Sequence, residues 1–173
     1  MKVKILDHID DFKLLEKEVI DLIETVGFEK NQIMCQTHRD NCQDWYTGIG
    51  RIEELEEKEE KKYKFINPLI KNTEISRLIE KYQGFRSRIM IMNPKSCYSV
   101  HQDPTPRIHI PITTDSLQSW MIWPFDNECY RMPIGMVYWA DTTKKHTFIN
   151  CSEKIRIHLI MGVDSYQTTP ETT

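Results

Sequence analysis

Two stretches in the second half of the sequence decide the fold: RIHIPI at residues 107–112 and IRIHL at residues 155–159. In both, Arg and His alternate with Ile or Leu. Successive side chains of a β-strand leave opposite faces, so each stretch predicts a strand with one aliphatic face and one Arg/His face. If the aliphatic faces pack under helices, the cationic faces point into the interior. A buried guanidinium needs an anionic partner, which a bound carboxylate would supply. Internal salt bridges or surface exposure are the alternatives.

Short β-rich stretches continue through this half, separated by Pro, Asn, Gly and charged turns. They are FRSRIMIM (85–92), CYSVHQD (97–103), RIHIPITT (107–114), SWMIWPF (119–125), MVYWADT (136–142), HTFIN (146–150) and IRIHLIMG (155–162). Strands this short and this closely spaced are typical of a sandwich or barrel. We therefore predict a mainly β (α+β) fold, a double-stranded β-helix or cupin-like jelly roll, with N-terminal helices packed on one sheet.

The first half of the sequence is helical by pattern. Residues 9–26 place apolar groups at helical spacing, and residues 73–83 form a second amphipathic segment behind an Asn-Thr cap. Residues 51–64, eleven of which are charged, predict a solvated helix or mobile loop. We expect a single domain over residues 1–173, made of a helical and charged N-terminal part (1–84), a β core (85–163) and a polar tail (164–173).

The composition narrows the function. The 173 residues carry a formal net charge of −3, so there is no basic excess to bind nucleic acid. No apolar run approaches the roughly 18 residues of a membrane-spanning helix, and charges appear too early for a secretory signal. The five cysteines are odd in number and include no CxxC, which argues against a disulfide framework. We expect a cytoplasmic protein with a small-molecule substrate; the sequence does not fix an oligomeric state.

A possible metal site lies in the β-rich half. His101 and Asp103 stand two residues apart, so their side chains share one face of a strand. His146 follows beside a later strand. Two His and one carboxylate form the facial triad of non-haem Fe(II) sites, which leaves positions open for a bidentate co-substrate and O₂. Each residue alone has a structural explanation, but the set together with Arg156 favours a metal, and iron over zinc.

With these residues in view, the sequence resembles the Fe(II)/2-oxoglutarate-dependent dioxygenases, and within them the aspartyl/asparaginyl β-hydroxylase-like branch. The resemblance covers roughly residues 86–163. It rests on an HxD motif, an R-x-H strand, a D-x-x-x-x-H-x-x-x-N segment and a second Arg-bearing strand, which are here His101/Asp103, Arg107-Ile108-His109, Asp141…His146…Asn150 and Arg156-Ile157-His158.

The resemblance implies a double-stranded β-helix that binds Fe(II) and 2-oxoglutarate. By this resemblance the iron ligands are His101, Asp103 and His146. The partner of the distal 2-oxoglutarate carboxylate is Arg156. Two further co-substrate contacts are Arg107 and His109. Some members of the branch lack the carboxylate ligand, whereas this chain has it. Met90 occupies the position of a serine that contacts 2-oxoglutarate in the branch, and Tyr98 is the candidate to replace it.

The implied reaction is hydroxylation of an unactivated C–H bond with release of succinate and CO₂. We expect a free amino acid or small carboxylate as substrate, and next a peptide or protein side chain of the Asp/Asn type. Weaker candidates also have ordinary structural explanations. Arg88 is a candidate partner for a substrate carboxylate, and Trp120, Trp123 and Tyr138 are candidates for the cavity mouth. Asp141 and Asn150 are candidates to orient the imidazoles.

Two rival classes remain open from the sequence. One is a metal-binding, cupin-like protein that is not an oxygenase, which would need a metal but no 2-oxoglutarate. The other is an inactive jelly roll that serves as a binding module. The intact set of His101, Asp103, His146 and Arg156 argues against the second.

Overall fold

The structure is a computed structural model that describes residues 1–50 and 56–164, so the polar tail predicted from residue 164 onward lies almost wholly outside it. The elements in chain order are β1 Val3–His8, α1 Phe12–Val26, β2 Gln32–Met34, β3 Gln36–Thr37, α2 Glu57–Glu60, β4 Phe65–Ile66, the 3₁₀ turn η1 Pro68–Ile70, α3 Glu74–Lys81, β5 Phe85–Met92, β6 Ser96–Cys97, β7 Arg107–Thr113, β8 Ser119–Trp123, β9 Glu128–Tyr130, β10 Met136–Ala140, β11 Thr147–Asn150 and β12 Arg156–Gly162.

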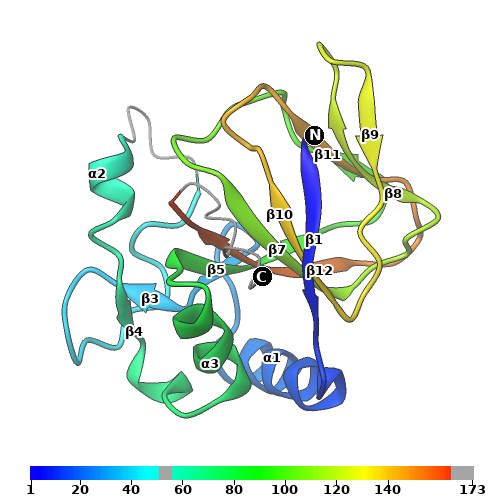
Figure 1. Ribbon diagram of the computed structural model, residues 1–173. Helices are drawn as coiled ribbons and strands as arrows, with labels where there is room; N and C mark the ends of the chain where they lie inside the picture. The colour runs from blue at the N-terminus through cyan, green and yellow to red at the C-terminus, as the bar shows by residue number, and fades with distance from the viewer. Residues whose placement is uncertain (51–55, 165–173) are drawn as a thin grey trace, which may run out of the picture.

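Two antiparallel sheets form the body of the protein (Figure 1). The larger has six strands in the order β1-β10-β7-β12-β5-β2, and the smaller has four in the order β6-β11-β8-β9. A separate pair, β3 and β4, lies at one edge of the molecule (Figure 1). Apart from the hairpin of β8 and β9, strands that pair within these two sheets are not consecutive in the chain, which is typical of a jelly roll. The predicted double-stranded β-helix is confirmed.

The alternation in β7 and β12 sorts their side chains as predicted. The aliphatic positions, such as Ile110 and Leu159, lie in a core cluster together with Leu15, Val19 and Leu78 of the helices α1 and α3. Both helices cover the same face of the larger sheet (Figure 1). The Arg/His positions therefore face the smaller sheet. A second cluster, which includes Met121, Trp123 and Phe148, fills part of the space between the sheets.

The two long helices begin and end where the sequence indicates. Asp11 caps α1 by accepting a hydrogen bond from the Leu14 N–H, and Gly27, at φ 75°, ends it. Thr73 caps α3 through a reciprocal capping box with Ser76. Neither helix, nor any other in the described ranges, is both long and apolar enough to span a membrane.

The first half of the chain, predicted as a helical and charged part, also contributes strands to the larger sheet. β1 pairs with β10, with Val3 opposite Ala140, and β2 pairs with β5, with Ile33 opposite Ile89. These strands close the two edges of the larger sheet. The sequence does not indicate either strand, because β2 is short and β1 has polar residues among its apolar ones. Their strand conformation depends on the strands with which they pair.

Candidate metal and co-substrate site

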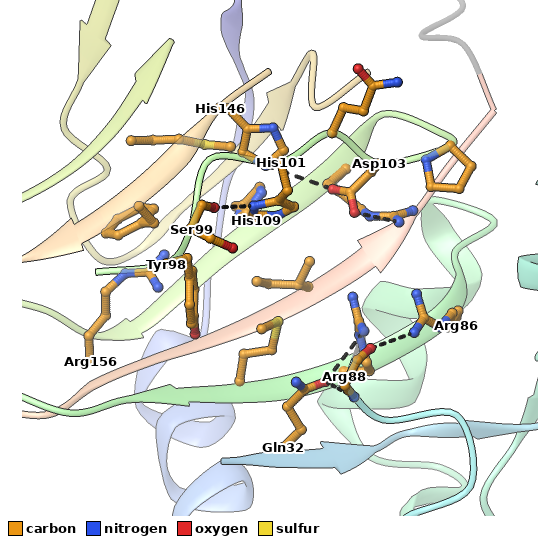
Figure 2. Close-up of a pocket in the computed structure, with 18 residues that line it drawn as sticks. Gln32, Arg86, Arg88, Tyr98, Ser99, His101, Asp103, His109, His146 and Arg156 are labelled. Atoms are coloured by element: carbon orange, nitrogen blue, oxygen red, sulfur yellow. Dashed lines mark hydrogen bonds and ion pairs between the residues drawn. The ribbon is translucent and has the colours of Figure 1, made fainter. Parts of the chain in front are cut away.

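A cavity of about 450 Å³ opens between the two sheets. The Arg/His faces of β5, β7 and β12 form one wall. The connection from Tyr98 to Pro104, between β6 and β7, forms another, with Met121 and Phe148 of the smaller sheet beside it. Figure 2 shows the charged and imidazole side chains converging on this space. The sequence had placed most of them in the interior, and the cavity is where they meet.

His101 and His146 are held together by the backbone. They form an isolated antiparallel bridge, in which the His101 N–H donates to the His146 carbonyl at 3.0 Å and the His146 N–H donates to the His101 carbonyl at 2.8 Å. Their ring centroids are 4.4 Å apart. Residues 45 positions apart in sequence thus become direct neighbours, which is the arrangement that the facial triad needs.

Backbone carbonyls set the tautomer of both imidazoles. Nδ1 of His101 lies 2.8 Å from the Ser99 carbonyl, and Nδ1 of His146 lies 2.9 Å from the Lys144 carbonyl. A carbonyl oxygen only accepts, so each Nδ1 carries the proton and each Nε2 keeps its lone pair. Burial lowers the pKa of His146 below its usual value, which also favours the neutral, ligating form.

Asp103 completes the group. Its N–H donates to the Thr142 carbonyl at 2.8 Å, which fixes the backbone. Oδ1 lies 3.2 Å from Nη2 of Arg107, and Oδ2 lies 3.9 Å from Nε2 of His146. Burial alone would raise the pKa of Asp103, but the charge of Arg107 and the nearby His146 lower it to about 2. The carboxylate is ionised, with one oxygen held by Arg107 and the other turned to the histidines.

The three side chains fit a single cation. One ligand atom from each of His101, Asp103 and His146 lies within 4.8 Å of the others. Two neutral imidazoles and one carboxylate suit Fe(II), and the adjoining cavity would admit small ligands to an ion held by these residues.

Arg156 lies at the far end of the cavity from Asp103 (Figure 2). Its side chain is 1% exposed, and no described residue forms a salt bridge with it. Nη2 is 2.5 Å from Nδ1 of His158, the guanidinium stacks 3.2 Å from the centroid of the Phe148 ring, and Nε has no partner. Burial lowers the pKa of Arg156 to about 9. A cation buried without an anion is the strongest indication that this cavity binds an anionic ligand.

Arg88 is a second buried cation in the cavity without a carboxylate. Its Nη1 donates to Oε1 of Gln32 at 3.3 Å, and Nε has no partner. Burial, with the charges of Arg86 and Arg107, lowers the pKa of Arg88 to about 9. Met90, on the same face of β5, also lines the cavity. Arg88 and Met90 are two positions apart in β5, so strand alternation puts both side chains on the cavity face.

Arg107 differs from the expectation that it contacts 2-oxoglutarate. Its guanidinium donates to both oxygens of Glu60, at 2.9 and 2.5 Å, and lies 3.2 Å from Asp103. The anionic partners of Arg107 are therefore internal. His109, two residues on, has both ring nitrogens buried without a hydrogen-bond partner, and burial, reinforced by the charge of Arg156, lowers its pKa well below the usual value. His109 faces the cavity as a neutral imidazole.

Tyr98 lies beside Arg156 in the cavity wall (Figure 2). Burial raises the pKa of its phenol, against the opposing charges of Arg156 and Arg88, so it is a neutral hydroxyl between the two cations. Met90 also lines the cavity, and the exchange of a serine contact for Tyr98 stays a prediction.

The three aromatic residues expected at the cavity mouth are not among the residues that line it. Trp123 is fully buried and donates from Nε1 to the Asp141 carbonyl at 2.9 Å, with its ring behind His146. Tyr138 donates to the Pro133 carbonyl, and Trp120 lies under the guanidinium of Arg131. Alternation along a strand predicts the face of the sheet on which a side chain lies, but it does not predict which neighbouring residues pack against that side chain.

Asp141 and Asn150 also differ from their predicted role of orienting the imidazoles, which the Ser99 and Lys144 carbonyls perform. Asn150 is a buried structural centre: its Oδ1 accepts from the hydroxyls of Ser119 and Ser152, and its Nδ2 donates to backbone carbonyls. Asp141 accepts from the hydroxyl of Thr143.

The residue that sequence reasoning missed is Glu60. It lies in the run 51–64, of which residues 51–55 are outside the described part, and it was expected to be solvated. The structure buries its side chain completely, between Arg86 and Arg107. Nothing in this highly charged run distinguishes Glu60 from its neighbours, because its two partners lie in β5 and β7, far away in the sequence.

No protein-family model matches the sequence, and no curated protein matches it. Among solved structures, the viral collagen prolyl hydroxylase vCPH of Paramecium bursaria Chlorella virus-1, in its 2OG complex, aligns over 95% of this chain and 97% of its own with TM-score 0.50 and 10% identity. A truncated form of vCPH aligns over 94% and 91%, with TM-score 0.50 and 12% identity. The alpha-ketoglutarate-dependent carbocyclase SnoK from nogalamycin biosynthesis aligns over 90% and 75%, with TM-score 0.43 and 11% identity. At these identities, the vCPH structures establish a shared fold, the double-stranded β-helix.

Proposed function

We propose that the protein is an Fe(II)- and 2-oxoglutarate-dependent dioxygenase that hydroxylates an unactivated C–H bond of an amino acid or small carboxylate. One observation carries the proposal: a cavity brings His101, Asp103 and His146 within reach of a single cation and places at its other end the guanidinium of Arg156, which has no acidic partner among the described residues. The fold shared with vCPH supports the reaction class. Membership of the aspartyl/asparaginyl β-hydroxylase branch rests on the sequence motifs alone.

The residues have separate tasks in this proposal. Nε2 of both histidines and one oxygen of Asp103 would hold the iron, and Arg156 would pair with the distal carboxylate of 2-oxoglutarate, with Tyr98 and His109 beside it. When bound, iron and 2-oxoglutarate supply the O₂-dependent oxidation of a C–H bond and release succinate and CO₂. The protein orients the two substrates, and the apolar side chains between the sheets keep water from the reacting atoms.

Arg88 supports a carboxylate as part of the substrate. Arg86 pairs with Glu60, and Arg107 pairs with both Glu60 and Asp103. Arg88 and Arg156 are therefore the two lining arginines without an acidic partner among the described residues. One anion would be the distal carboxylate of 2-oxoglutarate at Arg156. The other would belong to the substrate, bound by Arg88 with the amide of Gln32. A planar guanidinium beside an amide presents donors that match a carboxylate.

The proposal is tested by succinate formation. The protein is supplied with Fe(II), 2-oxoglutarate and O₂, and succinate is measured with a panel of free amino acids, small carboxylic acids and short Asp- or Asn-containing peptides. We expect slow succinate formation without substrate and faster formation with a member of the panel. His146→Ala should abolish both, while Lys145→Ala, a neighbouring surface change, should alter neither. Succinate formation that survives His146→Ala would contradict the proposal, and stimulation by peptides alone would assign the substrate to the protein class.

The role of Arg88 has its own test. Arg88→Met should remove the stimulation by substrate while slow, substrate-independent succinate formation continues at an unchanged 2-oxoglutarate requirement. If Arg88→Met instead raises the 2-oxoglutarate requirement and Arg156→Met does not, the assignment of the two arginines is reversed.

A further inference from the structure

Glu60 is a buried carboxylate that the proposed reaction does not use. It is the last residue of α2, a four-residue helix, and the charged side chains from Glu56 to Lys64 other than Glu60 are partly or fully exposed. The Glu60 side chain has no exposed surface, and both of its oxygens have partners. Burying a carboxylate is costly, and removing one member of a buried ion pair is more costly still. Glu60 therefore marks a place where the fold depends on a charge.

Glu60 and Asp103 share Arg107. Nη1 and Nη2 of Arg107 donate to the two oxygens of Glu60, and the same Nη2 lies 3.2 Å from Oδ1 of Asp103. Thr105 adds a third contact, since its hydroxyl donates to Oε2 of Glu60 at 3.0 Å. The arginine is thus a bridge: one carboxylate fixes the plane of its guanidinium, and the other is the candidate metal ligand.

Arg86 anchors Glu60 from the opposite side. Its Nη1 donates to Oε1 of Glu60 at 2.8 Å, and its Nη2 donates to the carbonyls of Gly48 and Gly50 at 2.9 and 3.0 Å. Arg86 has a positive φ of 48° and its N–H donates to the Tyr63 carbonyl, so its backbone is also fixed by the segment after α2. Glu60 is held in place independently of Asp103.

We propose that Glu60 is a positioning residue for the metal site, acting through Arg107 on the rotation of the Asp103 carboxylate. With Arg107 fixed, Asp103 gives Oδ1 to the guanidinium and keeps Oδ2 for the metal. Without Glu60, the guanidinium of Arg107 is free to take both oxygens of Asp103, as a guanidinium fork does with a carboxylate, and competes with the metal. This inference rests on the proposed metal site.

The test uses Co(II) as a probe of the metal-free protein in the absence of oxygen. Its binding is followed by visible d–d absorption, which reports both affinity and ligand geometry. Glu60→Gln keeps the size of the side chain and removes its charge. We expect Co(II) affinity to fall by about 10- to 100-fold, the range typical of changes to residues that orient metal ligands, with an altered d–d spectrum. Glu59→Gln, the same change on an exposed neighbour that pairs with Lys62, should change neither.

Two further variants separate positioning from folding and from general charge. Arg107→Lys leaves Glu60 in place but replaces the planar fork, whose two nitrogens donate to both Glu60 oxygens, with a single ammonium that this contact cannot orient in the same way, so it should lower Co(II) affinity to a similar extent. In an Arg107→Met background, adding Glu60→Gln should have little further effect, because the connection is already broken. Wild-type protein that binds no Co(II) would contradict the proposed metal site. Wild-type affinity and spectrum in folded Glu60→Gln or Arg107→Lys protein would overturn the role of Glu60.

Discussion

Replacing Arg156 with Met should make the ligand-free protein more stable while it removes the response to 2-oxoglutarate. The guanidinium is 1% exposed, and no described residue gives it an anionic partner. The effective cost of burying such a charge is several kcal/mol. Met has a similar stem without the charge, so it fills the space and avoids this cost.

The structure also indicates what the substitution loses. The hydrogen bond from Arg156 to His158 contributes about 1 kcal/mol, and the stacking on Phe148 about 1 kcal/mol, part of which a Met sulfur recovers. The remaining stabilisation is about 1–2 kcal/mol. For a protein of this size that corresponds to a rise of roughly 2–8 °C in Tm.

Thermal unfolding of the metal-loaded protein, with and without 2-oxoglutarate, measures both effects without oxygen. At about 100 times its Kd, the co-substrate should stabilise wild-type protein by about 2.7 kcal/mol and leave Arg156→Met unchanged, so that the order of the two Tm values reverses. Arg131→Met, which loses a stacked but exposed arginine over Trp120, should show neither effect. A lower Tm for ligand-free Arg156→Met, or an undiminished response to 2-oxoglutarate, would show that Arg156 is not a buried cation that binds the co-substrate.

Three further predictions concern stability. Burial holds the pKa values of His109 and His158 well below the usual one, so below about pH 6.5 the unfolded state binds more protons than the folded state. The free energy of unfolding measured in urea should therefore fall by about 3 kcal/mol from pH 7.5 to 5.5, and a flat profile would contradict this. Asn150→Ala leaves buried hydroxyls and carbonyls unpaired and should cost about 2–4 kcal/mol in the same assay; a loss below about 1 kcal/mol would show that water replaces the amide. Gly162→Ala would place Cβ 2.5 Å from the Phe85 ring and 2.6 Å from Nη1 of Arg107, and should cost about 1–3 kcal/mol; unchanged stability would mean that both neighbours move freely.

The fold was predictable because its strongest signal is periodic. Alternation in β7 and β12 separates aliphatic from cationic side chains, and the aliphatic sides do pack against α1 and α3. The same parity put Arg88 on the cavity side of β5. In each case the information lies within one strand, so a local pattern was sufficient.

The residues that were misplaced depend on partners elsewhere in the chain. Glu60 is buried because Arg86 and Arg107 meet it from two strands, and Trp123 is buried because β8 faces the second cluster between the sheets. The imidazoles are oriented by backbone carbonyls, which every residue type has, so no residue in the sequence indicates this role. The local sequence around these positions is compatible with the protein surface, the cavity mouth or a turn. Only contacts with residues distant in the sequence decide among these environments.

Anaerobic titration followed by visible absorption shows whether this cavity binds Fe(II) and 2-oxoglutarate together. Fe(II) is added to the protein with and without 2-oxoglutarate. We expect a weak charge-transfer band that appears only when both are present and is lost in His146→Ala. A protein that binds Fe(II) but forms no such band would be a metal-binding jelly roll of another class, and the proposed function would be wrong.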